Sequence, residues 1–196
     1  AEVSFTGVSR ERLGLVVTWT FRAYGGTGRV ETWMTFENRS SDSMTNLGAL
    51  RGSWADTSLT RMYVPLRGKI YELSSEMWRG GQYLPKKPED YHETWVALVD
   101  DTSGSSLGYV WSNDRAVEVI PFRGHASLNL ESKIPDLAPG ESATTSVLTV
   151  LIGEHTWRAV RQYWAYANAR TALTERPVQV AQDLSVGICL LYTSPS

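Results

Sequence analysis

The chain has 196 residues, of which 42% are hydrophobic and 20% charged, and its formal net charge is −2. This near-neutral balance gives no long-range attraction to nucleic acid or to an anionic membrane, so neither is expected as a partner. No apolar run approaches the ~20 residues of a membrane-spanning helix, and a single cysteine, Cys189, excludes an internal disulfide. A soluble domain is expected, with an extracellular or a periplasmic location both left open.

Two runs near the start of the chain predict a β-hairpin. In residues 15–21 and 29–37, apolar and polar side chains alternate with the period of two that is typical of a half-buried strand. The glycine-rich segment 25–28 between them supplies the positive φ angles of a tight turn. Because Trp33 falls on the charged face of the second run, together with Glu31, it is either covered by another sheet or offered to a partner.

The middle of the chain predicts further strands and one irregular segment. Weaker strand patterns cover residues 46–51 and 60–72, the second bent at Pro65 and Gly68. Residues 76–90 contain two glycines and two prolines and are too irregular for a helix or strand. Trp78 and Tyr83 lie in this segment, and aromatic residues on a long loop are candidates for a binding site.

Residues 91–99 predict a central strand, because apolar side chains occupy both of its faces. We therefore expect Trp95, or Val96 and Leu98, to lie in the main core. The remaining strands are predicted at residues 107–111, 116–122, 126–131 and 143–152.

The periodicity then changes to that of a helix. In residues 156–171 the apolar side chains of Trp157, Val160 and Trp164 recur at spacings of three and four, which predicts an amphipathic helix with Thr156 as its N-cap. This apolar stripe is expected to pack on the sandwich. Pro177 interrupts the chain, and a further strand is predicted over residues 178–188.

The last eight residues, 189–196, resemble the translation of a transposase mosaic end followed by sequencing-adapter DNA. Such segments are excluded from reasoning about the fold. The expectation is that the genuine sequence ends near Ile188, that the source is a prokaryotic metagenome, and that this tail makes few core contacts.

Motifs that would assign a chemistry are missing from the sequence. It contains no P-loop, dinucleotide fingerprint or nucleophile elbow, and its three histidines are not spaced as metal ligands, so no cofactor and no metal are expected. The one local acid–base pair is His92 with Glu93, both weak catalytic candidates. Adjacent residues of a strand point to opposite faces, so these two are not expected to act on one substrate atom.

Residues 91–153 resemble a stretch of the galactose-mutarotase-like supersandwich family. The resemblance rests on residues 93–100 (ETWVALVD), 107–111 (LGYVW) and 136–141 (DLAPGE), and on a last strand that ends at Gly153. It implies a sandwich fold that occurs in sugar epimerases and in non-catalytic domains attached to glycosidases, lyases and phosphorylases. The catalytic Glu and His motifs of the epimerases have no match here, so their activity is not carried over.

Together these observations predict a mainly β fold: a two-sheet antiparallel, supersandwich-like domain followed by one C-terminal helix. The sandwich spans residues 1–153, the helix and a linker 154–176, the start of a further segment 177–188, and the adapter-like tail 189–196.

The predicted function is that of a carbohydrate-binding or accessory domain of a larger carbohydrate-active protein. Partners are a carbohydrate and neighbouring domains of the same chain, and the fragment alone is not expected to be an enzyme. Two alternatives stay open: a sugar epimerase or glycan-cleaving unit using a carboxylate such as Glu93, and a purely structural module. The candidate carbohydrate-binding residues are Glu31, Trp33, Trp78, Arg79, Gln82, Tyr83 and Trp111.

Overall fold

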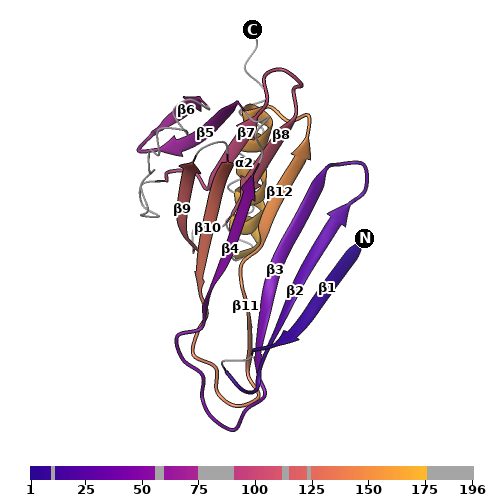
Figure 1. Ribbon diagram of the computed structural model, residues 1–196, viewed down its shortest axis with the longest axis vertical. Coiled ribbons are helices and arrows are strands. Elements are labelled where there is room, and N and C mark those ends of the chain that lie inside the picture. The colour runs from indigo at the N-terminus through magenta and orange to yellow at the C-terminus, as the bar shows by residue number, and fades with distance from the viewer. Residues whose placement is uncertain (10–11, 56–59, 75–90, 112–114, 123–124, 176–196) are drawn as a thin grey trace.

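The computed structural model describes residues 1–9, 12–55, 60–74, 91–111, 115–122 and 125–175 (Figure 1). For residues 48–55, 115–122, 125–133 and 170–175 it is the backbone that is described. The predicted strand at 178–188, the adapter-like tail and the aromatic loop 76–90 all lie outside the described residues.

The described part of the chain is mainly β, with one C-terminal helix, as the sequence predicts. Its strands are β1 (Glu2–Val8), β2 (Leu15–Tyr24), β3 (Arg29–Asn38), β4 (Gly48–Ala55), β5 (Arg61–Leu66), β6 (Lys69–Ser74), β7 (Trp95–Val99), β8 (Ser106–Val110), β9 (Arg115–Phe122), β10 (His125–Lys133), β11 (Ser142–Thr144) and β12 (Leu148–Gly153). The helix is α2 (Trp157–Glu175). No helix in the described residues is long and apolar enough to cross a membrane.

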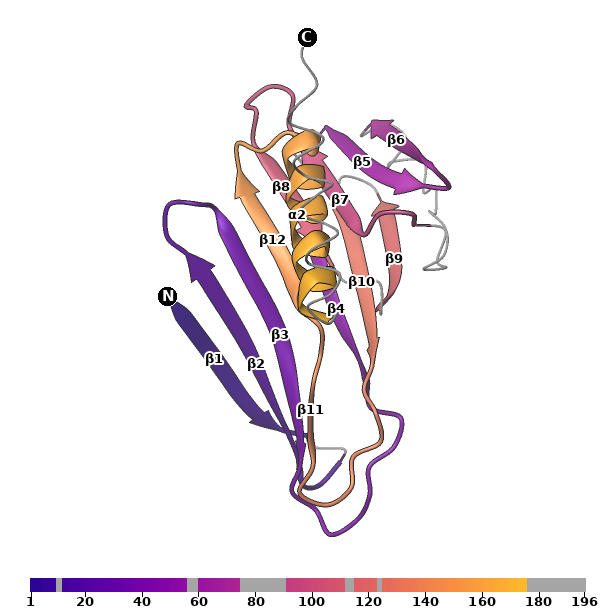
Figure 2. The same ribbon diagram turned by 180° about the vertical axis from the view of Figure 1, so that it is seen from behind.

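Two antiparallel sheets contain the described strands. The larger has nine strands, eight of them in the order β1-β2-β3-β12-β8-β7-β5-β6. The ninth, β11, pairs with residues 35–37 of β3, whereas β12 pairs with residues 29–32 of the same strand. The smaller has the order β4-β10-β9. Seen from its two sides, the larger sheet has the β4-β10-β9 sheet in front of it in Figure 1 and α2 in front of it in Figure 2. This layering is consistent with the expected sandwich, with the helix as an added outer layer.

The central strand β7 is buried on both faces, which confirms the sequence prediction. Val96 and Leu98 belong to a core on one side of the sheet, and Trp95 and Ala97 to a core on the side of α2, all with no exposed surface. Val160 of α2 packs at the centre of the second core, where it too is fully buried. A third core cluster lies where β2 begins and β3 ends. It contains Leu15, Phe36, Met44, Leu47, Ile134 and Leu137.

The apolar stripe of the helix packs on the sheet as predicted. Trp157 and Trp164 flank Val160 against the sheet, and the Trp157 ring stacks on Trp95 with centroids 6.3 Å apart. The Thr156 hydroxyl accepts a 3.2 Å hydrogen bond from the Ala159 N–H, which confirms it as the N-cap.

Three of the predicted strands differ from the observed ones. Residues 60–72 form the hairpin β5–β6 rather than one bent strand, because Arg67 and Gly68 take positive φ angles of 47° and 78° and reverse the chain. Residues 143–152 are split into β11 and β12, which pair with β3 at different points. The central strand begins at Trp95 instead of residue 91, and β1 was not predicted at all.

Candidate functional site

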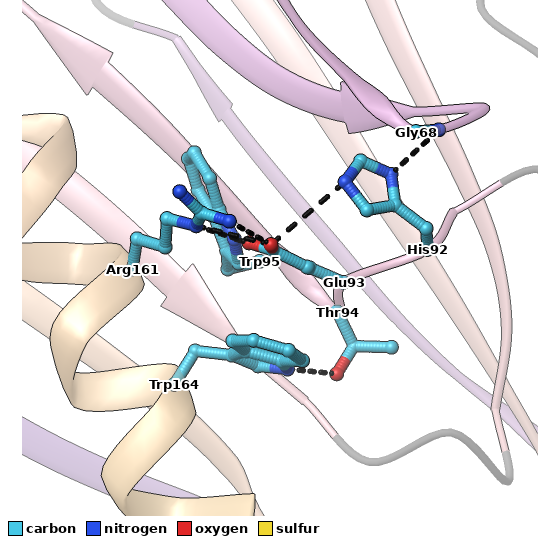
Figure 3. Close-up of polar contacts among 7 residues, drawn as sticks. All are labelled: Gly68, His92, Glu93, Thr94, Trp95, Arg161 and Trp164. Carbon is cyan, nitrogen blue, oxygen red and sulfur yellow. Dashed lines mark hydrogen bonds and ion pairs between the residues drawn. The ribbon is translucent and has the colours of Figure 1, made fainter. Parts of the chain in front are cut away.

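The entrance to β7 carries a cluster of polar side chains that contact one another (Figure 3). The Arg161 guanidinium, on α2, donates hydrogen bonds to both carboxylate oxygens of Glu93, with its Nε at 3.0 and 2.8 Å and its Nη2 at 2.5 Å. The Trp95 indole N–H donates to the same carboxylate at 2.6 Å. Glu93 is buried whereas the Arg161 side chain is 47% exposed. This bidentate ion pair joins α2 to the sheet.

The charge of Glu93 is stabilised by these donors. Burial raises the pKa of the Glu93 carboxyl, but the hydrogen bonds from Arg161 and Trp95 outweigh it and hold this pKa below its ordinary value. The pKa of Arg161 is raised by the hydrogen bond to Glu93. Both groups therefore carry their charges at neutral pH, and both carboxylate oxygens are already engaged. This arrangement suits a clamp between elements better than a group that exchanges protons.

His92 lies closer to Glu93 than the sequence predicted. Its Nε2 is 3.8 Å from the carboxylate, and its Nδ1 accepts a 3.2 Å hydrogen bond from the Gly68 N–H in the β5–β6 turn. The expectation that the two side chains point to opposite faces is wrong, because residues 92 and 93 form a bend before β7 begins and the strand alternation does not apply there.

A second polar connection joins the same helix to the sheet. The Trp164 indole N–H donates to the Thr94 hydroxyl at 2.9 Å (Figure 3). This hydroxyl donates in turn to the carbonyl of Trp111 at 2.6 Å. The helix is thus fixed at two successive residues just before β7, by Glu93 and by Thr94.

A different surface carries Trp33. The registers of β1, β2 and β3 place alternate residues on the side of the sheet where α2 lies, and we call this surface the Trp33 face. Its members are Glu2, Ser4, Thr6, Val8, Val16, Thr18, Thr20, Arg22, Tyr24, Arg29, Glu31, Trp33, Thr35 and Glu37. Cross-strand hydroxyl pairs join Ser4 to Thr20 at 2.9 Å and Thr6 to Thr18 at 3.1 Å. Trp33 is a half-buried aromatic plane within this polar surface.

Two arginines of the Trp33 face contact its aromatic rings at different distances. The Arg29 guanidinium carbon lies 3.5 Å from the Tyr24 centroid, while that of Arg22 lies 5.0 Å from the Trp33 centroid. The Tyr24 hydroxyl donates to Glu31 at 2.6 Å. Tyr24 is therefore closely covered, whereas Trp33 has the looser contact.

The predicted site residues are only partly brought together. Glu31 and Trp33 share the Trp33 face through their positions on β3. Trp111 is buried on the other side of the sheet, edge-to-face with Tyr91, so it is not near that face. Glu93 lies beneath the helix, across β12 and β8 from β3.

The four loop candidates, Trp78, Arg79, Gln82 and Tyr83, lie outside the described residues. Sequence reasoning singled out Glu93 but missed its partner Arg161, which is 68 residues away. It also missed Arg22 and Tyr24, which lie beyond the predicted strand 15–21 and which the β2–β3 register places on the side of Glu31 and Trp33. Among the described residues, no group of three histidine, cysteine or acidic side chains is placed to hold a metal ion.

Comparisons with known proteins match the fold but not the sequence. No protein-family model matches the chain, and no curated protein matches it. A GH36 α-galactosidase of Geobacillus stearothermophilus, solved in complex with stachyose, matches 82% of this chain and 25% of its own with a TM-score of 0.56 at 15% identity. A TPR-domain containing protein from Parabacteroides distasonis matches 79% of this chain and 33% of its own with a TM-score of 0.56 at 10% identity.

A galactose mutarotase-like protein from Lactobacillus casei matches 77% of this chain and 69% of its own, with a TM-score of 0.51 at 16% identity. At such low identity these likenesses show the fold alone. The chain has a fold shared with galactose mutarotase-like and GH36 proteins, and the likeness extends well beyond the segment 91–153 that suggested it. The chain spans a third or less of the first two structures, so it corresponds to one part of each.

Proposed function

We propose that this chain is a carbohydrate-binding domain of a larger carbohydrate-active protein, and that the sugar lies on the Trp33 face. The observation that carries the proposal is the half-buried indole of Trp33 in the middle of a polar sheet surface. A sugar ring needs an aromatic plane under its C–H face and planar polar groups for its hydroxyls. Trp33 supplies the plane, and the Glu31 carboxylate and Arg22 guanidinium supply the polar groups.

Access to the indole requires Arg22 to move. Arg22 donates a 2.8 Å hydrogen bond to Glu2, and both side chains are about half exposed, at 46% and 48%. Ion pairs this exposed to water contribute little to stability, so the guanidinium moves aside at small cost. Having moved, it is a donor beside the ring. Tyr24 is a poorer platform, because Arg29 already covers it at 3.5 Å.

The fold supports the same proposal. The GH36 neighbour was solved with stachyose, and another GH36 structure with raffinose. We therefore place oligosaccharides with galactose units first among the ligands to be tried. Glu93 is left outside the proposed site, since Arg161 and Trp95 occupy both of its oxygens.

Isothermal titration of the chain against stachyose, raffinose and a set of plant and microbial polysaccharides tests the proposal. We expect millimolar or tighter binding to at least one of them, and a loss of about tenfold or more in the association constant for Trp33→Ala, equivalent to about 1.4 kcal/mol. Trp19→Ala is the matched control, because Trp19 is on the neighbouring strand but points to the other side of the sheet. An absence of binding to every glycan, or equal losses in both variants, would contradict the proposal.

A further inference from the structure

Within the described residues, strand β1 forms an open edge of the larger sheet. All seven of its residues pair with β2 in one register without a bulge, and no other strand of the described residues lies on its outer side. Every β1 residue is exposed, including Val3 at 53%, Phe5 at 62% and Val8 at 65%. Natural sheets usually protect such an edge with lysine, proline or a bulge. Strand β1 has none of these, so it is a template for another strand.

The phase of the β1–β2 ladder shows which groups face outward. The Ala23 N–H donates to the Ala1 carbonyl at 2.8 Å, and the Ser9 N–H donates to the Leu15 carbonyl at 2.9 Å. Odd-numbered residues of β1 are therefore the ones bonded to β2. Because the two sides of an antiparallel strand alternate, the N–H and C=O groups of Glu2, Ser4, Thr6 and Val8 point to the open edge.

We propose that β1 pairs with β1 of a second copy of this chain, antiparallel, about a twofold axis at Phe5. Phe5 is the middle residue of the strand, so this register leaves no β1 residue unpaired. It joins Ser4 to the partner's Thr6 and Glu2 to the partner's Val8, and these are the residues whose backbone groups face outward. The two Phe5 residues form the central pair without backbone hydrogen bonds, where side chains approach most closely.

The side chains of β1 are complementary to themselves in this register. Glu2 is the one charged residue of the strand and lies at its end, so antiparallel pairing separates the two Glu2 carboxylates, whereas parallel pairing would place like charges side by side. The Ser4 and Thr6 hydroxyls would meet across the axis, as they already meet Thr20 and Thr18 within one chain. Phe5 would contact its copy as it now contacts Phe21, edge-to-face at 6.1 Å.

The resulting dimer is expected to be weak, because one strand edge buries less surface than a standard stable interface. Sedimentation velocity over a concentration series should show the average mass rising toward twice that of the monomer. Thr6→Pro removes an outward N–H without removing a bond to β2, so it should keep the chain folded and monomeric. Thr6→Ala, the matched control, keeps the N–H and should still dimerise.

Cysteine cross-linking tests the register. In a Cys189→Ser background, Phe5→Cys brings two thiols together at the axis within the span of a disulfide, and oxidation should convert most of the chain to a covalent dimer. Val8→Cys is equally exposed but faces Glu2 of the partner, so it should cross-link several-fold less.

Equal cross-linking of the Phe5→Cys and Val8→Cys variants would overturn the register. A chain that stays monomeric at every concentration would overturn the proposal and leave the edge to a strand of another protein or domain. A folded Thr6→Pro variant that still dimerises would place the contact elsewhere.

Discussion

The ion pair between Glu93 and Arg161 gives the most direct test of how α2 is held to the sheet. Replacing Arg161 with Met keeps the apolar stem but leaves the Glu93 carboxylate buried with the Trp95 indole as its remaining close donor. Breaking a fully buried pair costs about 3–5 kcal/mol. Because Arg161 is 47% exposed, we expect a smaller loss of about 2 kcal/mol in the free energy of unfolding. For a domain of this size that lowers Tm by roughly 4–8 °C.

The dependence on pH identifies the cause of the loss. The pKa of Glu93 is held below the ordinary value for a glutamate, so the pair stabilises the fold above that ordinary value and the contribution disappears as pH falls through the lowered pKa. Without Arg161, burial raises the pKa of Glu93 and the carboxyl is protonated in mild acid. Urea unfolding should therefore show a larger deficit for Arg161→Met at pH 7 than at pH 4.

Two further variants complete this test. Glu93→Gln combined with Arg161→Met should recover part of the loss, because the buried charge is gone. Arg158→Met is the matched control, since Arg158 is an exposed helix arginine placed 5.1 Å over the Trp157 ring. A loss below about 0.5 kcal/mol for Arg161→Met, or a loss that does not change with pH, would refute the reasoning.

Three other substitutions probe the packing around the helix and the first hairpin. Trp164→Ala should lower the free energy of unfolding by about 3 kcal/mol, measured by denaturant titration, and a loss under 1 kcal/mol would mean that the helix is not anchored there. Gly108→Ala puts a Cβ 2.5 Å from the Val160 side chain, so a cost of about 1–3 kcal/mol is expected, and adding Val160→Ala should relieve part of it. Gly28→Ala would put an alanine at a φ of 61° with its Cβ 2.0 Å from the Ile152 carbonyl oxygen. Calorimetry should therefore show a Tm lower by several degrees, and an unchanged Tm would contradict that contact.

The elements with a clear periodicity were predictable from the sequence. The hairpin β2–β3, the central strand and α2 each follow from alternation or from three- and four-residue spacing, since these patterns depend on local geometry. The division of residues 60–72 into two strands was not predicted. The turn between them needs Arg67 in the left-handed region beside Gly68, a conformation that an arginine rarely adopts. Strand β1 alternates too, with Val3 and Phe5 against Ser4 and Thr6, but so short a run was not predicted as a strand.

The contacts that define the candidate sites were harder to predict, because they join distant parts of the chain. Glu93 was noticed because His92 stands next to it in the sequence. The residue that stabilises its negative charge is Arg161, which lies on the helix. That Trp33 lies on the polar side of β3 follows from the alternation of that strand alone. The contact of Arg22 with Trp33 requires the register of β2 with β3, which no local pattern specifies.

The two proposals make a joint prediction, because pairing at β1 extends the Trp33 face. The twofold axis is perpendicular to the sheet, so the Trp33 faces of both copies would lie on one side of a continuous sheet, joined through Ser4 and Thr6. A polysaccharide could then contact both copies, and linking two sites raises apparent affinity without new contacts.

Thr6→Pro, which should separate the copies, is therefore expected to weaken binding to a polysaccharide by tenfold or more relative to Thr6→Ala. The two variants lose the same hydroxyl from the Trp33 face, so they should bind a trisaccharide such as raffinose equally well. Titrations of both ligands against the two variants, at a concentration where the unmodified chain is dimeric, measure this difference. Equal losses for the short and the long ligand would show that Thr6→Pro damages the face itself, and no loss for either would show that the two copies bind independently.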